Sequence, residues 1–184
     1  MDGIAMETKQ IPFEQTPEFL LGESGEDVVI AFLKSKGWHI VPSRDYNKDK
    51  GGSKAPCLQG ETTGFILPDL DISCPRRGRR WVEVKTYNTS PFNRAHKINV
   101  HGVNVRHYRD YRSVEQITGA PVWLFVYEIA KGILLSAKLF NLQQYPCLCL
   151  SCRNGNTSRC LVYFNRADFH SIDLRQLDLF GGQP

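Results

Sequence analysis

Two neighbouring stretches, FILPDLDIS (residues 65–73) and RRWVEVKTY (residues 79–87), decide the fold. Both alternate apolar and polar residues, as half-buried strands do, and PRRG (residues 75–78) between them is a turn sequence. They predict an antiparallel hairpin with an apolar face, formed by Leu70, Ile72, Val82 and Val84, and a charged face, formed by Asp69, Asp71, Trp81, Glu83 and Lys85.

The register of this hairpin decides which acids meet. A turn centred on Arg77 sets Asp71 opposite Glu83 and Asp69 opposite Lys85. If the register slips by two residues, Asp69 replaces Asp71 without a change of face. Like charges in directly opposite positions destabilise a sheet, and a divalent cation would remove that cost. Mg²⁺ prefers oxygen ligands of this kind.

A helix is expected before the hairpin, in GESGEDVVIAFLKSKGW (residues 22–38). Ser24 is a candidate N-cap and Gly37 a candidate stop, which predicts a helix from about 25 to 36.

Glu26 is the acidic residue of this helix that points inward. At about 100° per residue it shares a stripe with apolar residues three, four and seven positions later, whereas Asp27 lies on the side of Lys34. A buried carboxylate is costly unless it is paired or binds a metal, so Glu26 is a candidate site residue. The alternative is that Glu26 only complements the helix dipole.

The remaining elements indicate an α/β fold, in which a mixed central sheet is flanked by helices. Residues 38–44 and 121–129 have strand patterns, and 103–119 suit a helix that opens near Asn104 and closes at Gly119. A second hairpin is expected from residues 132–139 and 160–164.

Length and composition favour one domain over residues 22–184, preceded by an extension over residues 1–21. The chain has 184 residues, 41% of them hydrophobic, and a net charge of +4, which permits a polyanionic partner without demanding one. No apolar run is long enough to span a membrane, and the first residues lack a signal peptide's pattern, so we expect a cytoplasmic protein with no membrane partner.

The succession GESGEDVVIAFLKSKGW, PDLDI and WVEVKTY resembles the PD-(D/E)xK nuclease superfamily, in particular its Holliday-junction-resolvase-like small members. The resemblance covers residues 22 to 128. It implies a restriction-endonuclease-like core and a metal-dependent endonuclease or resolvase-like enzyme that hydrolyses DNA phosphodiester bonds.

The same resemblance assigns roles to individual residues. The catalytic set that it implies is Glu26, Asp71, Glu83 and Lys85, with Lys85 acting on the attacking water. Mg²⁺ or Mn²⁺ would be held by Asp71, Glu83 and the backbone carbonyl of Val84, and Glu26 would join the metal shell or hold a second ion. Asp69 is the alternative ligand, because it follows Pro68 as in the family's name. A homodimer is expected, since paired cuts require two active sites.

Basic residues near the motif are candidates for contact with nucleic acid. The candidates are Arg76, Arg77, Arg79 and Arg80 in the turn, and Tyr108, Arg109 and Arg112 in the second helix. The alternative is a solvated turn and a solvated helix face. DNA is the expected substrate, and nothing in the pattern rules out RNA.

A cysteine-rich loop at residues 147–160 predicts a structural Zn²⁺ site formed by Cys147, Cys149, Cys152 and Cys160. An iron–sulfur cluster, with Cys57 or Cys74 as a distant ligand, and simple burial as small apolar residues are the alternatives. The rival function is therefore a non-catalytic nucleic-acid-binding module with a nuclease-like fold and a zinc knuckle.

Overall fold

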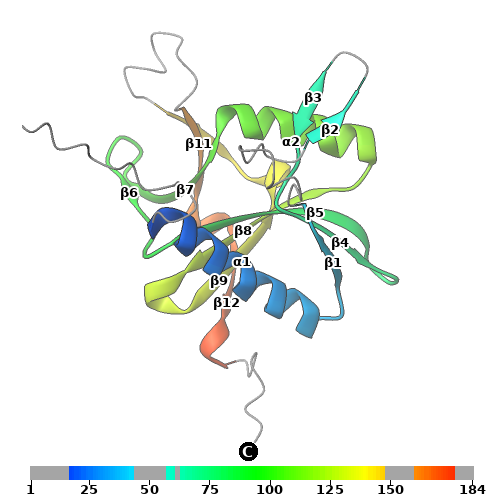
Figure 1. Ribbon diagram of the computed structural model, residues 1–184. Coiled ribbons are helices and arrows are strands. Elements are labelled where there is room, and N and C mark those ends of the chain that lie inside the picture. The colour runs from blue at the N-terminus through cyan, green and yellow to red at the C-terminus, as the bar shows by residue number, and fades with distance from the viewer. Residues whose placement is uncertain (1–16, 44–56, 61–62, 148–159, 177–184) are drawn as a thin grey trace, which may run out of the picture.

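The computed structural model describes residues 17–43, 57–60, 63–147 and 160–176. Its centre is a six-stranded mixed sheet with helix α1 on one face and helix α2 on the other (Figure 1). This confirms the predicted fold class, a mixed α/β sheet flanked by helices.

The main sheet has the order β1-β4-β5-β8-β9-β12. Only β5 and β8 run parallel, and every other neighbouring pair is antiparallel. The strands are β1 (His39–Pro42), β4 (Leu70–Cys74), β5 (Gly78–Tyr87), β8 (Val122–Glu128), β9 (Ile133–Lys138) and β12 (His170–Asp173).

Two smaller sheets flank the main one. The larger has the order β10-β11-β7-β6, and the other pairs β2 with β3. Their strands are β2 (Cys57–Gln59), β3 (Gly64–Ile66), β6 (Phe92–Asn93), β7 (Ile98–Asn104), β10 (Gln144–Pro146) and β11 (Leu161–Asn165). Short 3-10 helices cover Ile129–Lys131, Leu139–Asn141, Arg166–Asp168 and Leu174–Gln176.

The second predicted hairpin was wrong. Strand β9 pairs with β8 and β12 in the main sheet, whereas β11 pairs with β7 and β10 in the smaller one. Both segments are strands, as expected, but long-range pairing separates them, and a local sequence pattern carries no information about such pairing.

Helix α1 (Pro17–Ser35) begins well before the predicted start. Ser24 therefore lies inside the helix, and its assignment as the N-cap was wrong. Proline is favoured in the first turn of a helix, because its missing N–H would have no intrahelical partner there. The predicted stop is confirmed: Gly37 has a φ of 78°, and its N–H donates to the Lys34 carbonyl at 2.9 Å.

Helix α2 (Val105–Thr118) has the predicted ends. The Asn104 side chain caps it by accepting a hydrogen bond from the Arg106 N–H at 2.8 Å, and Gly119 ends it in the left-handed conformation. Within the described ranges, neither α1 nor α2 has the length and apolarity that crossing a bilayer would demand.

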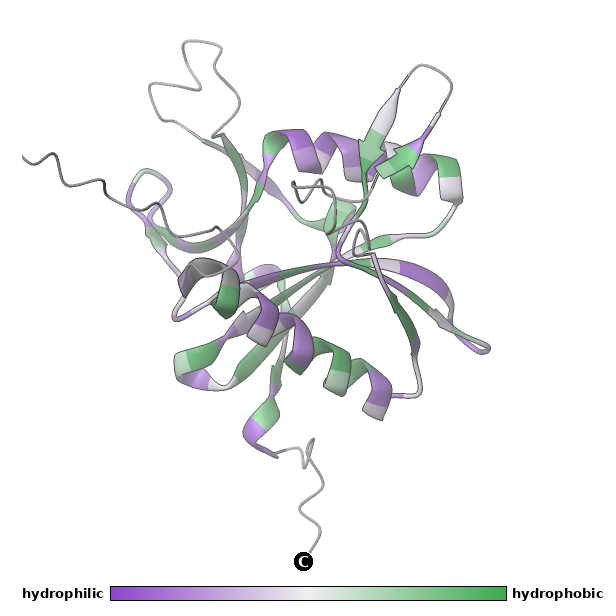
Figure 2. Ribbon diagram, in the orientation of Figure 1, coloured by the Kyte–Doolittle hydropathy of each residue, from purple (hydrophilic) through white to green (hydrophobic). Residues whose placement is uncertain are grey.

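The two faces of the main sheet are both buried. Helix α1 packs Val29, Phe32 and Leu33 on the even-numbered residues of β5. Helix α2 packs Tyr108, Tyr111 and Val114 on the opposite face, against Trp81 and the strand β8. Both helices alternate hydrophilic and hydrophobic residues, as helices that cover a sheet on one side do (Figure 2). The charged face of the hairpin is therefore covered by α2 and not open to solvent along its length.

Candidate active site

The β4–β5 hairpin has the slipped register. Asp71 lies opposite Trp81, and Leu70 lies opposite Val82, so the predicted pairing of Asp71 with Glu83 was wrong. The hairpin closes at the pair Cys74 and Gly78, which centres the turn one residue earlier than expected. Residues keep their faces, because a slip of two preserves the alternation.

Asp71 consequently meets a cation instead of an acid. Its two carboxylate oxygens accept hydrogen bonds from Nε and NH2 of Arg79, both at 2.8 Å. The bond with Asp71 raises the pKa of the Arg79 guanidinium above its usual value. The charge of Asp71 is thus neutralised by Arg79 within the hairpin, and Asp71 does not lie opposite Glu83.

Asp69 takes the position that was expected for Asp71. It precedes the first residue of β4, and its Oδ2 accepts a hydrogen bond from the Val84 backbone N–H at 2.8 Å. The carboxylate thereby extends the strand pairing beyond the backbone ladder. Burial raises the pKa of Asp69 well above its usual value, and the charge of Glu83 raises it further.

Glu83 is the most buried acid of this group, with 1% of its surface exposed. Its Oε2 accepts a hydrogen bond from the Tyr111 hydroxyl at 2.5 Å, and its Oε1 forms an ion pair with Nζ of Lys85, also at 2.5 Å. A buried carboxylate requires such partners, because an unpaired one loses its hydration without compensation.

Lys85 is about one-third exposed, so the cluster reaches solvent at this side chain. Burial lowers the pKa of the Lys85 ammonium, but the charges of Glu83 and Asp69 raise it by more, and the net pKa lies above its usual value. Lys85 is therefore a cation at neutral pH, able to donate hydrogen bonds to an anion or a water molecule.

Tyr111 is a site residue that the sequence analysis missed. It is 2% exposed on the inner face of α2, and burial, followed by the charge of Glu83, raises the pKa of its phenol well above the usual value. The hydroxyl stays protonated and holds Glu83 in place as a donor. The one signal that pointed to it was its position on the buried stripe of α2, three residues before Val114.

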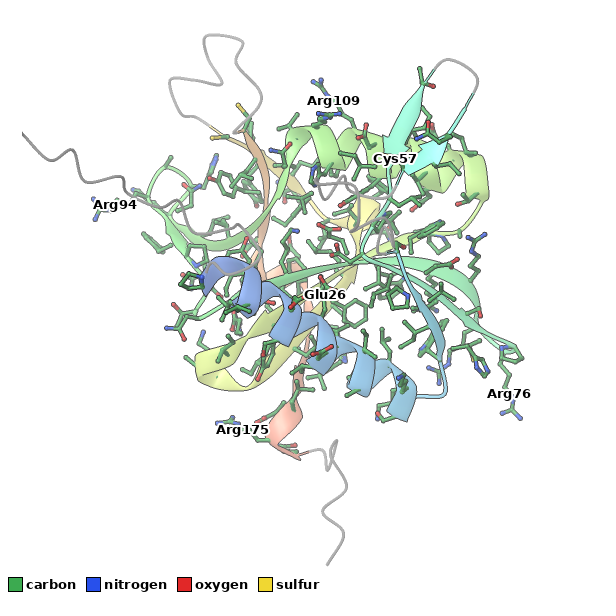
Figure 3. All side chains as sticks on the ribbon, viewed as in Figure 1. Glu26, Cys57, Arg76, Arg94, Arg109 and Arg175 are labelled. Carbon is green, nitrogen blue, oxygen red and sulfur yellow. The ribbon has the colours of Figure 1, made fainter. Side chains whose placement is uncertain are left out.

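Glu26 lies on α1 (Figure 3), and its charge acts on the same cluster. It is half-buried, and its charge contributes to the raised pKa of Asp69. The preceding residue sets this position: a Cβ on Gly25 would collide with the side chain of Thr86 on β5. Glycine is therefore required where the helix crosses the strand.

The oxygen-rich donor set suits a hard divalent cation. Asp69 and Glu83 supply two carboxylates, and no hydrogen bond from the described residues reaches Oδ1 of Asp69. No group of three or more His, Cys, Asp or Glu side chains is arranged to hold a metal within the described ranges. Two carboxylates agree with Mg²⁺, which usually takes one or two together with waters and a substrate phosphate.

The basic residues divide between two places. Arg76 and Arg77 lie in the β4–β5 turn, where Figure 3 labels Arg76, and Arg79 and Arg80 lie in the first half of β5, toward the opposite end of the strand from Lys85. On α2, Arg109 is exposed, and Arg112 lies over the ring of Phe140 at 5.5 Å. Tyr108 is 7% exposed and accepts a hydrogen bond from Gln144 at 2.8 Å, which makes it a helix–sheet contact.

The cysteine cluster is only partly described. Cys149 and Cys152 lie outside the described residues, Cys147 is half-buried, and Cys160 is buried and disulfide-bonded. A disulfide sulfur is not the thiolate that ligates Zn²⁺. The zinc site, and its iron–sulfur alternative, stay predictions.

The chain shares its fold with a known DNA-processing enzyme. It is similar to the structure of Hjc, a Holliday junction resolvase from the archaeal hyperthermophile Archaeoglobus fulgidus, with a TM-score of 0.50 and 10% sequence identity. The match covers 79% of this chain and 89% of the resolvase. No family model and no curated protein matches the sequence. At this identity the likeness shows the fold alone.

Proposed function

We infer that the protein is a metal-dependent nuclease that hydrolyses DNA phosphodiester bonds, as an endonuclease or a resolvase-like enzyme. The observation that carries this inference is the cluster of Asp69, Glu83 and Lys85 on one buried hairpin. The cluster contains two carboxyl groups and only one ammonium group, and the lysine that carries the ammonium reaches solvent. The resolvase fold supports the inference independently.

Each residue has a role that follows from its contacts. Asp69 and Glu83 would hold Mg²⁺ or Mn²⁺, with Glu26 and the Val84 carbonyl as further candidates, whereas Asp71 is occupied by Arg79. A divalent cation in such a site supplies an activated water and neutralises charge on the phosphate. Lys85, as a cation, orients the attacking water and the phosphate oxygens. Tyr111 fixes the rotamer of Glu83.

A cleavage assay tests the inference. We would incubate the protein with matched linear, single-stranded and four-way-junction DNA, and with an RNA of the same sequence, in Mg²⁺, Mn²⁺ or EDTA. Lys85→Ala is compared with Lys34→Ala, which removes an exposed lysine of α1. We expect wild type to cut only when the metal is present. The cleavage rate of Lys34→Ala should equal that of wild type, and the rate of Lys85→Ala should be lower by about a thousandfold.

The rival function, a non-catalytic nucleic-acid-binding module, has its own outcome in this assay. If wild type binds the nucleic acids but cuts none of them in either metal, the nuclease inference fails and the binding module replaces it. The ranking of the four substrates identifies the preferred one. Sedimentation of the protein with and without the preferred DNA tests the proposed homodimer, and a monomer in both conditions would contradict it.

A further inference from the structure

A cavity of about 320 Å³ lies between the end of helix α1 and the β4–β5 hairpin. The end of α1 and the hairpin lie on the same side of the molecule (Figure 1), at the opposite end of β5 from Lys85. None of the residues of the acidic cluster lines the cavity. The lining side chains that matter here are Lys36, Trp38, Arg77, Arg80 and Trp123.

Arg80 is the central cation of this cavity. Its guanidinium lies between two indole rings, 4.7 Å from the centroid of Trp38 and 4.6 Å from that of Trp123. Both rings attract the guanidinium, but they offer no lone pairs to its five N–H groups. Burial, and then the charge of Arg77, lower the pKa of Arg80. Its charge is partly desolvated, and no carboxylate among the described residues forms an ion pair with it.

The surroundings add positive charge and no negative charge. The guanidinium of Arg77 lies 5.9 Å from the Trp38 ring, and the ammonium of Lys36 lies 5.6 Å from the Phe32 ring. No acidic side chain is among the described residues that line the cavity, and none of the ion pairs in that part of the chain involves Arg77 or Arg80. The Nε1–H of Trp123 is buried without an acceptor.

We propose that this cavity binds a phosphate-bearing ligand with a planar apolar body, for which a nucleotide is the simplest case. Arginine is suited to phosphate because its planar fork of donors matches the phosphate oxygens, and here two indole rings contact that fork before any ligand binds. The apolar walls around Phe32, Trp38 and Trp123 suit the body of the ligand, since small-molecule sites are mostly apolar with a few placed polar groups.

The ligand has two possible sources, a free nucleotide and an unpaired nucleotide of a nucleic-acid strand. Both present the same phosphate and base. The proposal does not depend on the nuclease function, because it involves neither the carboxylates nor Lys85, and binding is measured without cleavage.

Isothermal titration calorimetry in EDTA tests the proposal. The titrants are deoxyadenosine monophosphate, deoxyadenosine, a single-stranded oligonucleotide and a blunt duplex. We expect the monophosphate, the oligonucleotide or both to bind with a dissociation constant below about 1 mM, and deoxyadenosine to bind at least tenfold more weakly.

Variants locate the binding. Arg77→Ala removes an exposed cation of the cavity and should weaken binding by about tenfold, whereas Arg94→Ala, an exposed arginine of the β6–β7 turn (Figure 3), should leave it unchanged. Arg80→Gln should weaken binding more than Arg77→Ala does, and circular dichroism checks that the Arg80→Gln variant is folded.

The pattern of loss identifies the source. Weakening of the monophosphate alone indicates a free nucleotide, weakening of the oligonucleotide alone indicates a nucleic-acid strand, and weakening of both indicates a site open to either. The proposal is overturned if neither ligand binds wild type, or if Arg77→Ala and a folded Arg80→Gln bind both as tightly as Arg94→Ala does.

Discussion

Two glutamates in neighbouring strands are almost completely buried and differ in their partners. Glu83 on β5 contacts Lys85 and Tyr111, and it lies close enough to Asp69 to raise the pKa of that second acid. Glu128 on β8 is surrounded by donors: Arg166 binds both of its oxygens at 2.9 Å, and Ser90, His101 and Lys131 add further contacts.

The pKa shifts express this difference. Burial raises the pKa of Glu128, but the hydrogen bonds and charge of Arg166, with Lys131, lower it by more, so its net pKa is below the usual value. The Asp69 carboxyl beside Glu83 shifts in the opposite direction. A buried acid with enough donors stays ionised and is costly to strip of its partners, whereas an excess of buried acid is a cost that a proton or a bound cation removes.

Glu83→Gln should show the largest effect on activity. The amide keeps the shape and can still accept from Tyr111, but it removes a metal-binding charge, so we expect cleavage to fall by about a thousandfold. The free energy of unfolding should change by only about 1 kcal/mol, because the Lys85 ammonium keeps Asp69 as a counter-charge. Single-turnover cleavage and urea unfolding measure the two quantities. Asp71→Asn is the matched control, and a similar loss in that variant would contradict the corrected register.

Glu128→Gln should show the reverse pattern. It leaves the Arg166 guanidinium and the Lys131 ammonium without their shared anion, so the free energy of unfolding should fall by about 3 kcal/mol. Urea unfolding measures the loss, and Arg166→Gln in the same chain should recover part of it. Unchanged stability with lost cleavage would mean that this cluster also belongs to the active site.

The Glu128 cluster should make stability depend on pH through His101. Burial lowers the pKa of this histidine to about 4. The positive charges of Arg166 and Lys131 lower the pKa as well, whereas the negative charge of Glu128 raises it by less than the other causes lower it. Between pH 6.5 and 4 the unfolded chain therefore binds more protons than the folded one. Stability should fall on acidification by up to about 1.4 kcal/mol per pH unit within this window. Urea unfolding of wild type and His101→Gln gives this contribution as a difference, and parallel curves would contradict it.

Tyr111→Phe should show the smallest effect. It removes one donor to Glu83 and leaves Lys85 in place, so we expect cleavage to fall by about tenfold and the free energy of unfolding by about 1 kcal/mol. Because Tyr111 only positions Glu83, the Tyr111→Phe change should lower kcat and leave KM unchanged. Tyr145→Phe, a change of the same chemistry on β10, is the control, and equal effects would remove Tyr111 from the site.

The helices and strands could be predicted from the sequence better than their pairing. Local signals placed β5 and both helix ends at Gly37 and Gly119, because turn and cap residues act over a few positions. The strand expected over residues 65–73 is instead divided between β3, which pairs with β2, and β4. The register failed because shifting the turn centre by one residue keeps every side chain on its face and changes only the opposite partner. The charged residues therefore kept their face, while Asp69 replaced Asp71.

Two further misses have their physical origin in long-range contacts. Strand β7 pairs with β11, which lies more than fifty positions away in the chain, and Tyr111 reaches Glu83 across the helix–sheet interface. The early start of α1 was missed for a local reason, because Gly22 and Pro17 interrupt the usual helix pattern. Asp69, Glu83 and Lys85 share one hairpin, so they were accessible from the sequence.

The close crossing of Gly25 over Thr86 links two positions that lie 61 residues apart. A relative with a side chain at position 25 would need a smaller residue at position 86. Otherwise α1 would move away from β5, and Glu26 would move away from Asp69. The two positions should therefore vary together among natural relatives. That covariation would mark chains that retain the geometry of this site even where the rest of the sequence has diverged.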